Sequence, residues 1–389
     1  MHKDKILDML NKSKNYYQAI AVLIGQIVGV GIFGMPFLFA KAGLLSLLFF
    51  IVFIGLVQYF IHLVYANLVL ATPTYHQLPG YTEMYLGRRA KNFIFVANLI
   101  GNYCALLAYT IVSSAFLCQL LSPVLGGSEF IYAVVIFSIE AAIVFFGVHF
   151  LARVELVMAF LLVFIVSLIA WRSFDFIQVS NYITVNWKYF LIPYGAMLFT
   201  LDGTPVIPFI VELLDKNKDD VKKVVRIGTL IPTVITAIFS LVIIGISGAN
   251  ITPDALIGIK SVLRDGVVVL SLVFGVLCIF TSFIGSAQSL RKIYHWDYKI
   301  NKHLAWFFTM SIPFLLYLAG INDFINVISF AGAVSGGISA IVLITIVSKI
   351  NNDVDKIAIF KRRLPSFFLY TLITMFTAGI LYEIFCFLL

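Results

Sequence analysis

Long apolar stretches, separated by short charged or turn-rich segments, dominate this sequence. Eleven runs of at least 18 mostly apolar residues can be counted, near 16–40, 43–71, 92–122, 130–150, 152–171, 189–213, 227–248, 266–289, 302–319, 324–348 and 366–388. A helix of this length crosses the hydrocarbon core of a bilayer. The pattern therefore predicts an all-α, polytopic membrane protein with eleven spans.

Two of these runs are interrupted by residues that break helices. In the first, the stretch from Gly25 to Pro36 holds four glycines and a proline. Broken backbone at membrane depth leaves N–H and C=O groups unpaired, which is tolerated only where protein, ligand or cavity water satisfies them. We interpret this stretch as half of a binding site, with close helix packing at the glycines as the alternative.

The second interruption lies in the sixth run, between Pro193 and Pro208. Asp202-Gly203 is a turn dipeptide, and Thr204-Pro205 is typical of a helix start. We expect a new half-helix from Pro205, with the Asp202 carboxylate in the gap facing a ligand. The alternative is that Asp202 only caps this half-helix.

Breaks in spans 1 and 6 occupy corresponding places in two five-helix halves. An odd number of spans in each half makes the halves inverted, which is the architecture of transporters that bind substrate between broken helices. Span 11 falls outside the repeat, and we expect it to be peripheral. The expected organisation is a cytoplasmic tail, a first five-helix repeat, a second inverted repeat, and a cytoplasmic loop with the eleventh helix, at residues 1–15, 16–171, 172–348 and 349–389.

Composition and charge agree with a membrane protein. Of the 389 residues, 61% are hydrophobic and 12% are charged, and the net charge is +8. The basic residues concentrate in the N-terminal tail and in every second loop, the positive-inside pattern, so we expect the N-terminus in the cytoplasm and the C-terminus outside. The charge thus reflects topology in a bilayer rather than a nucleic-acid partner. The exceptions on the other side are Lys41, Arg172, Lys188, Lys260 and Arg264.

Other candidate groups are polar residues within spans. Span 3 carries a polar stripe, for which we favour interhelical hydrogen bonds at Asn98 and Ser113 and a cavity position at Asn102 and Tyr109. Glu140, in span 4, is either functional or a neutral, hydrogen-bonded structural acid. The four cysteines form no C-x-x-C pair, so neither a disulfide framework nor a zinc site is expected.

The chain resembles the amino acid–polyamine–organocation superfamily, and within it the amino acid/auxin permease-like and aromatic amino acid permease branches. The resemblance covers spans 1 to 10. The residues that carry it are Gly25 to Pro36, Gly147 to Glu155, Pro193 to Pro208 and Gly228 to Pro232. It implies the LeuT-type fold, with discontinuous helices 1 and 6, and secondary transport of amino acids.

The resemblance also implies two sets of site residues. A sodium site between spans 1 and 8 would use Gly25, Val28, Cys278, Thr281 and Ser282. Span 5 has no mid-span lysine of the kind that replaces this cation in some proton-coupled members. The substrate would lie among Gly29, Val30, Gly31, Ile32, Phe33, Asn102, Tyr109, Phe199, Thr200, Asp202 and Gly203.

We therefore expect sodium-coupled symport of a neutral, bulky apolar amino acid by alternating access in the cell membrane. No cofactor is expected beyond the coupling ion, and a monomer would suffice. Asp202 departs from the uncharged residue usual in sodium-coupled relatives, so proton coupling stays open. An amino-acid-sensing receptor on the same fold also stays open. A membrane enzyme is less favoured, because the sequence offers no catalytic constellation.

Overall fold

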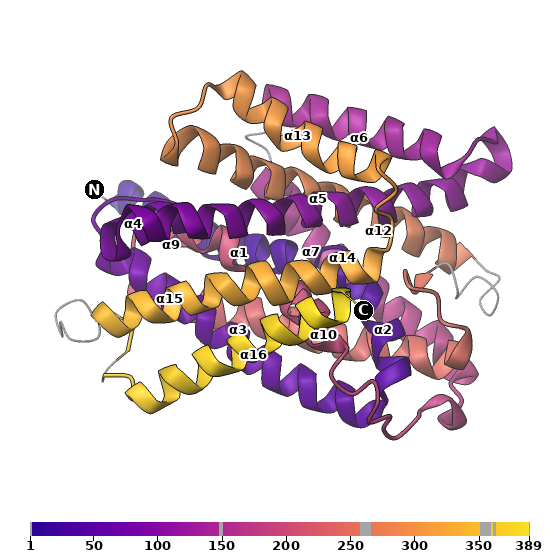
Figure 1. Cartoon of the computed structure of the whole chain (residues 1–389). Coiled ribbons are helices and arrows are strands. Elements are labelled where there is room, and N and C mark those ends of the chain that lie inside the picture. Colours follow the sequence, from indigo (N-terminus) through magenta and orange to yellow (C-terminus); the bar gives the residue numbers. More distant parts are fainter. Residues whose placement is uncertain (1, 148–150, 257–265, 351–358, 361–362, 389) are drawn as a thin grey trace.

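The computed structural model describes residues 2–147, 151–256, 266–350, 359–360 and 363–388 (Figure 1). Within these ranges the chain is a bundle of helices without β-strands. Every predicted apolar run coincides with a helix or a broken pair. The long elements are α1 (His2–Ile27) with α2 (Gly31–Ala42), α3 (Leu44–Ala71), α5 (Arg88–Leu125), α6 (Glu129–Phe146), α7 (Leu151–Ser173), α8 (Pro193–Thr200) with α9 (Ile207–Leu213), α10 (Lys218–Ser247), α12 (Gly266–Lys292), α13 (Lys302–Leu318), α14 (Phe324–Phe330) with α15 (Gly337–Ile350), and α16 (Ser366–Leu388).

Short elements connect or interrupt these helices. They are α4 (Leu78–Leu86), the 3₁₀ turns η1 (Phe174–Phe176), η2 (Val179–Asn181), η3 (Thr204–Val206) and η4 (Gly248–Asn250), and the π-helical segments η5 (Ile293–Asp297) and η6 (Ala331–Gly336). Among the described residues, eight spans are long and apolar enough to cross a membrane, and α1 with α2 forms a ninth, bent by 50°. The helices α7 and α13 occupy the two remaining predicted runs.

The first span is broken where the glycines predict it. The helix α1 ends at Ile27 and α2 begins at Gly31, so residues 28–30 form the helix 1 break. At its other end α1 begins at His2, and the expected tail is therefore helical in continuation of the span. The first helix thus starts well before its apolar run.

The sixth span is broken more gradually than expected. The helix α8 ends at Thr200, residues 201–203 form the helix 6 break, and the chain resumes as the 3₁₀ turn η3 before α9. A regular half-helix from Pro205 was therefore wrong by two residues, because α9 starts at Ile207. Proline has no N–H to donate, and Pro205 and Pro208 both lie in this restart.

The two breaks lie against each other in the bundle interior. A Cβ atom added to Gly31 would lie 2.5 Å from Thr200 Oγ1 and 2.9 Å from Thr200 Cα. The tenth span approaches α8 as closely, since a Cβ on Gly332 would lie 2.0 Å from the Gly195 carbonyl oxygen. Glycine at these positions allows the broken segments to meet.

Peripheral elements frame this interior. Figure 1 places α4 and the N-terminal end of α1 at the same end of the bundle. The helix α16 packs along α15 and is mostly exposed, as expected for a helix outside the repeat. The expected turn around residues 148–150, together with Lys260, Arg264 and parts of the 349–363 loop, lies outside the described residues.

Candidate functional site

A cavity of about 910 Å³, including its opening, lies where the two breaks meet. Its walls come from the first span (α1 and α2), the third (α5), the sixth (α8 and η3), the eighth (α12) and the tenth (η6 and α15). Tyr65 of the second span, α3, also lines it. Seven of the eleven predicted substrate residues line it: Gly29, Gly31, Asn102, Tyr109, Phe199, Thr200 and Asp202. The remaining lining residues, which are the larger part of the wall, were not among the predicted ones.

The other four predicted substrate residues do not line this cavity. Ile32 and Phe33 face a small apolar hollow beside α7 and α10 instead. Gly203 is packed against Leu23 and His62, and its N–H is already hydrogen-bonded.

Backbone N–H groups at the start of α2 face the helix 1 break. Gly29 N–H donates to the Ile27 carbonyl at 3.0 Å, and Phe33 N–H donates to the Val30 carbonyl at 3.1 Å. These two donors are therefore not free for a carboxylate. The N–H groups of Gly31 and Ile32 belong to the first turn of α2, where helix geometry supplies no partner and the helix dipole is positive.

Asp202 combines the two roles that the sequence left open. Its Oδ1 atom accepts hydrogen bonds from the Thr204 N–H at 2.9 Å and the Thr204 hydroxyl at 2.7 Å. The carboxylate therefore caps the restart of the sixth span. Thr204, the other candidate for the cap, donates both of its hydrogen bonds to Asp202. Asp202 also lines the cavity, so the same carboxylate faces the space between the breaks.

The predicted cation ligands lie directly behind Gly29. The Ser282 hydroxyl of α12 donates to the Gly25 carbonyl of α1 at 3.3 Å, and the Thr281 hydroxyl donates to the Cys278 carbonyl at 3.0 Å. A Cβ on Gly29 would lie 3.4 Å from Ser282 Oγ. The structure thus joins Gly25 of α1 to Ser282 of α12 next to the cavity wall, while Thr281 and Cys278 bond each other within α12.

One pair of these oxygens, Gly25 O and Ser282 Oγ, is spaced compatibly with a cation of sodium size, and the same 3.3 Å is the length of their hydrogen bond. Sodium has nearly the ionic radius of calcium, whose oxygen ligands lie at about 2.3–2.6 Å, so two ligands at a right angle would be about 3.4 Å apart. Gly25 O and Ser282 Oγ fit this separation. Within the described residues, no cluster of three or more His, Cys, Asp or Glu side chains could hold a metal.

The structure adds cavity residues that the sequence pattern did not single out. Ser286 and Ser289 of α12 follow Ser282 by four and seven residues, a helical spacing that predicts one shared face. Gln26 adjoins the predicted ligand Gly25, and Ser335 lies in η6. The helical period could have identified the two α12 serines.

The remaining polar predictions have mixed outcomes. The Ser339 hydroxyl donates to Asn98 Oδ1 at 3.1 Å, which confirms the expected interhelical bond. Ser113 instead donates to the Thr110 carbonyl of its own helix, so the prediction of an interhelical bond there was wrong. A serine hydroxyl reaches a carbonyl one turn back as easily as a neighbouring helix. Glu140 is fully buried, and neither carboxyl oxygen has a hydrogen-bond partner among the described residues.

Aromatic side chains pack together on the α2 side of the breaks. The Phe33 ring makes edge-on contacts with Phe116 of α5, at 5.2 Å between centroids, and with Phe239 of α10, at 6.0 Å. All three rings are buried. We call Phe33, Phe116 and Phe239 the aromatic seal.

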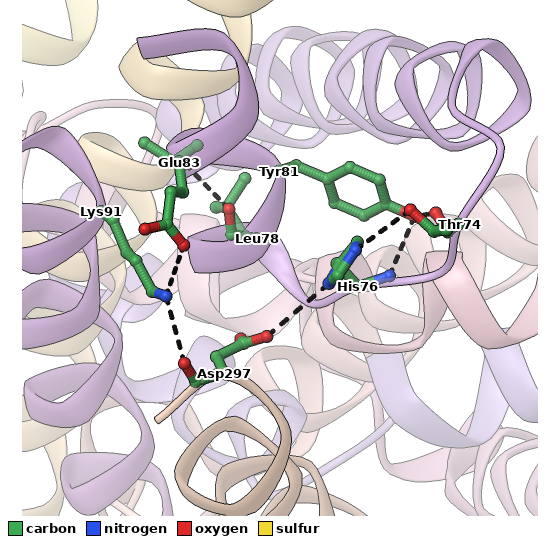
Figure 2. A network of polar contacts seen from close by, with 8 residues as sticks. Thr74, His76, Leu78, Tyr81, Glu83, Lys91 and Asp297 are labelled. Atoms are coloured by element: carbon green, nitrogen blue, oxygen red, sulfur yellow. Dashed lines mark hydrogen bonds and ion pairs between the residues drawn. The ribbon is translucent and has the colours of Figure 1, made fainter. Parts of the chain in front are cut away.

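The cavity extends towards the opposite end, where Gln77 and Leu78 at the start of α4 and Ile293 of η5 line it. Beside this mouth, Lys91 Nζ donates to Glu83 Oε2 at 2.5 Å and to the Asp297 carbonyl at 3.1 Å (Figure 2). The helix α4 therefore connects through Lys91 of α5 to the end of the eighth span.

Ionisation in this mouth network follows from burial and neighbouring charge. Burial, reinforced by Lys91 and Lys299, lowers the pKa of His76 below its usual value. Its imidazole lies 3.1 Å from the Thr74 hydroxyl and 4.0 Å from the Asp297 carboxylate. Burial also raises the pKa of Tyr81 to about 12, so its hydroxyl stays neutral.

Comparison with known proteins supports the fold and assigns the family. No curated protein sequence matches the chain significantly. The solved structure of MhsT in complex with L-phenylalanine resembles it with a TM-score of 0.70 at 14% sequence identity, over 95% of this chain and 97% of that one. This likeness confirms the all-helical, LeuT-type architecture. The sequence model of the tryptophan/tyrosine permease family matches residues 12–383, and the chain therefore belongs to the tryptophan/tyrosine permease family.

Proposed function

We propose that this protein transports a bulky apolar, most simply an aromatic, amino acid across the cell membrane by alternating access. The observation that carries the proposal is the contact between the two helix breaks, at Gly31 and Thr200, beside a cavity that contains Asp202. The carboxylate of a zwitterionic amino acid would then meet the N–H groups at the start of α2, and its ammonium would meet Asp202. The membership of the chain in a permease family and its likeness to a phenylalanine-bound structure support the same substrate class.

The substrate would be oriented by its charged ends. Its carboxylate would accept hydrogen bonds from the free N–H groups at the start of α2, where the helix dipole favours an anion. Its ammonium would lie near Asp202. Its side chain would extend towards Tyr109 and Phe199, the predicted aromatic residues that line the cavity.

Sodium is the coupling ion that the α1–α12 oxygens support best. Gly29 separates the pair Gly25 O and Ser282 Oγ from the cavity, so an ion there and a substrate in the cavity would share one backbone segment. An ion that orders this segment raises substrate affinity, and by linkage the substrate raises ion affinity equally.

A proton is the alternative coupling ion, with Asp202 as its acceptor. This alternative has a specific basis, because the Asp202 carboxylate faces the cavity and the usual uncharged residue is absent. Proton coupling through Asp202 predicts uptake that responds to a pH gradient without sodium.

Uptake into proteoliposomes tests the function and the ion together. Purified protein is reconstituted, and tryptophan, tyrosine, phenylalanine and smaller amino acids are supplied with a sodium gradient or a proton gradient alone. We expect sodium-driven uptake that is strongest for the aromatic amino acids. Binding of an amino acid without uptake under either gradient would instead support a sensing receptor on this fold.

The cation site is tested by the double variant Thr281→Ala/Ser282→Ala. Loss of both hydroxyls removes two of about five oxygen ligands, so sodium dependence should shift to much higher concentration and substrate affinity should fall with it. Ser271→Ala is a matched control, because Ser271 lies on the same helix and donates to the Val267 carbonyl of that helix. An unchanged sodium dependence in the double variant would place the ion elsewhere.

A further inference from the structure

Two polar side chains of α3, one helical turn apart, contact the sixth span, one just before its break and one within it. Gln58 Nε2 donates to the Leu198 carbonyl at 2.8 Å, and His62 Nε2 accepts from the Gly203 N–H at 2.9 Å. Gln58 is 5% exposed and His62 is fully buried. Their spacing of four residues places them on one face of α3.

The two backbone groups that they contact are those that the break deprives of helical partners. In a continuous helix, the Leu198 carbonyl would accept from the N–H of residue 202, and the Gly203 N–H would donate to the carbonyl of residue 199. Here the Asp202 N–H donates to the Phe199 carbonyl instead, at 3.2 Å. Both vacated groups would otherwise be buried without partners, which proteins rarely tolerate.

The hydrogen bonds of His62 also fix its tautomer. A backbone N–H can only donate, so Nε2 carries no proton, and Nδ1 donates to the Thr229 hydroxyl of α10 at 2.9 Å. His62 therefore joins α3, α10 and the helix 6 break. The contact is tight, because a Cβ on Gly203 would lie 3.1 Å from His62 Nε2 and 2.6 Å from the Leu23 side chain.

We propose that Gln58 and His62 are positioning residues that hold the helix 6 break in its unwound form and thereby fix Asp202 in the cavity. Asp202 lies between the two backbone groups that they bind. Without these partners, the two backbone groups have no fixed hydrogen bonds, so the break fluctuates and no longer holds the carboxylate at the breaks. The inference rests on the proposed transport function for one of its two tests.

The first test is independent of transport and uses amide hydrogen exchange of the purified protein. Loss of the Nε2 acceptor in His62→Leu should speed exchange in peptides that cover residues 198–206 by tenfold or more. His62→Gln, whose side-chain oxygen can replace Nε2, should exchange nearly as wild type. Ser46→Ala is the matched control, because Ser46 is a buried α3 residue that donates to the Phe190 carbonyl at 2.8 Å, away from the break.

The second test is a double-mutant cycle on uptake kinetics. His62→Leu alone should raise KM at least tenfold, but less than twofold in an Asp202→Asn background, because the side chain acts through Asp202. His62→Gln should restore most of the affinity. A buried residue with a merely structural role would instead lower the amount of active protein and leave KM unchanged, as expected for Ser46→Ala.

Several outcomes would overturn the inference. Additive effects of His62→Leu and Asp202→Asn on KM would do so, as would unchanged exchange at residues 198–206 in folded His62→Leu. If that variant does not fold, Thr229→Val removes the anchor of the imidazole more gently, and Thr229→Ser should rescue it. Absence of uptake by the wild type would refute the transport function, and hydrogen exchange would still decide the positioning role.

Discussion

Replacement of Gly31 by alanine tests the contact between the two breaks most directly. The added methyl would lie 2.5 Å from Thr200 Oγ1 and 2.9 Å from Thr200 Cα. Carbon atoms in favourable contact are about 3.5–4.0 Å apart, so α2 and α8 would have to separate by roughly 0.5–1 Å. The Thr200 Cα is backbone, and rotation of a side chain cannot relieve this clash.

The magnitude follows from two opposing effects. Overpacking of this kind costs about 1–3 kcal/mol, and alanine in a helix gains about 1 kcal/mol over glycine, so the protein should remain folded. Function should suffer more, because a misplacement of about 1 Å at a reacting site lowers rates about 100-fold in enzymes. We expect Gly31→Ala to reduce uptake at least tenfold at saturating ion concentration.

The matched control is Gly34→Ala, one turn later in α2. Its three nearest atoms would belong to side chains and not to backbone: Ile325 Cδ1 at 3.0 Å, and Ile328 Cδ1 and Phe324 Cε1 at 3.1 Å. Thr200→Ala should rescue Gly31→Ala in part, since it removes the hydroxyl but leaves the Cα. Equal uptake and melting temperature in Gly31→Ala and Gly34→Ala would refute the contact between the breaks.

Three further predictions concern charge. In Asp202→Asn the remaining carbonyl oxygen can still accept both bonds from Thr204, so the fold should persist while the apparent substrate affinity falls about tenfold, or roughly 1.4 kcal/mol; unchanged uptake kinetics would reduce Asp202 to a helix cap. His76 has a lowered pKa, so its contribution to stability is present above its usual pKa of 6.5 and is lost as the pH falls through the lowered value. Thermal unfolding below pH 6.5 should therefore be less acid-sensitive in His76→Gln than in the wild type. For topology, a cysteine at Asn250 should be labelled from outside intact cells and one at Lys218 should not; the reverse result would invert the predicted orientation.

The fold was largely predictable because the bilayer imposes simple demands on a sequence. Continuous apolar runs gave the helices, and glycine and proline within runs 1 and 6 gave the two breaks, since nothing else disrupts a helix so reliably. The π-helical segments η5 and η6 were not predicted. Such segments depend on packing between helices. The sequence around Gly332 contains nothing except the glycine itself that would predict its close approach to α8.

Site residues could be predicted where their residue type is unusual in an apolar span. They could not be predicted where the direction of the side chain decides what it contacts. Asp202 and the Thr281-Ser282 pair stand out in apolar sequence. Phe33 lies in the broken stretch, yet its ring points into the aromatic seal, because the bend between α1 and α2 decides its direction. The role of His62 has no signal in the sequence, since its partner Gly203 is 141 residues away.

The aromatic seal has a consequence for the energetics of the whole cycle. Its two edge-on ring pairs are worth about 0.5–1.5 kcal/mol each, so parting both costs about 1–3 kcal/mol. If the transport cycle opens this side by parting both pairs, a difference of this size would make the open conformation about 5- to 150-fold rarer than the closed one. An amino acid approaching from that side would then bind only this minor population, and its apparent affinity would be weaker by the same factor. Trimming one ring would strengthen binding from the seal side while leaving every atom that touches the substrate in place.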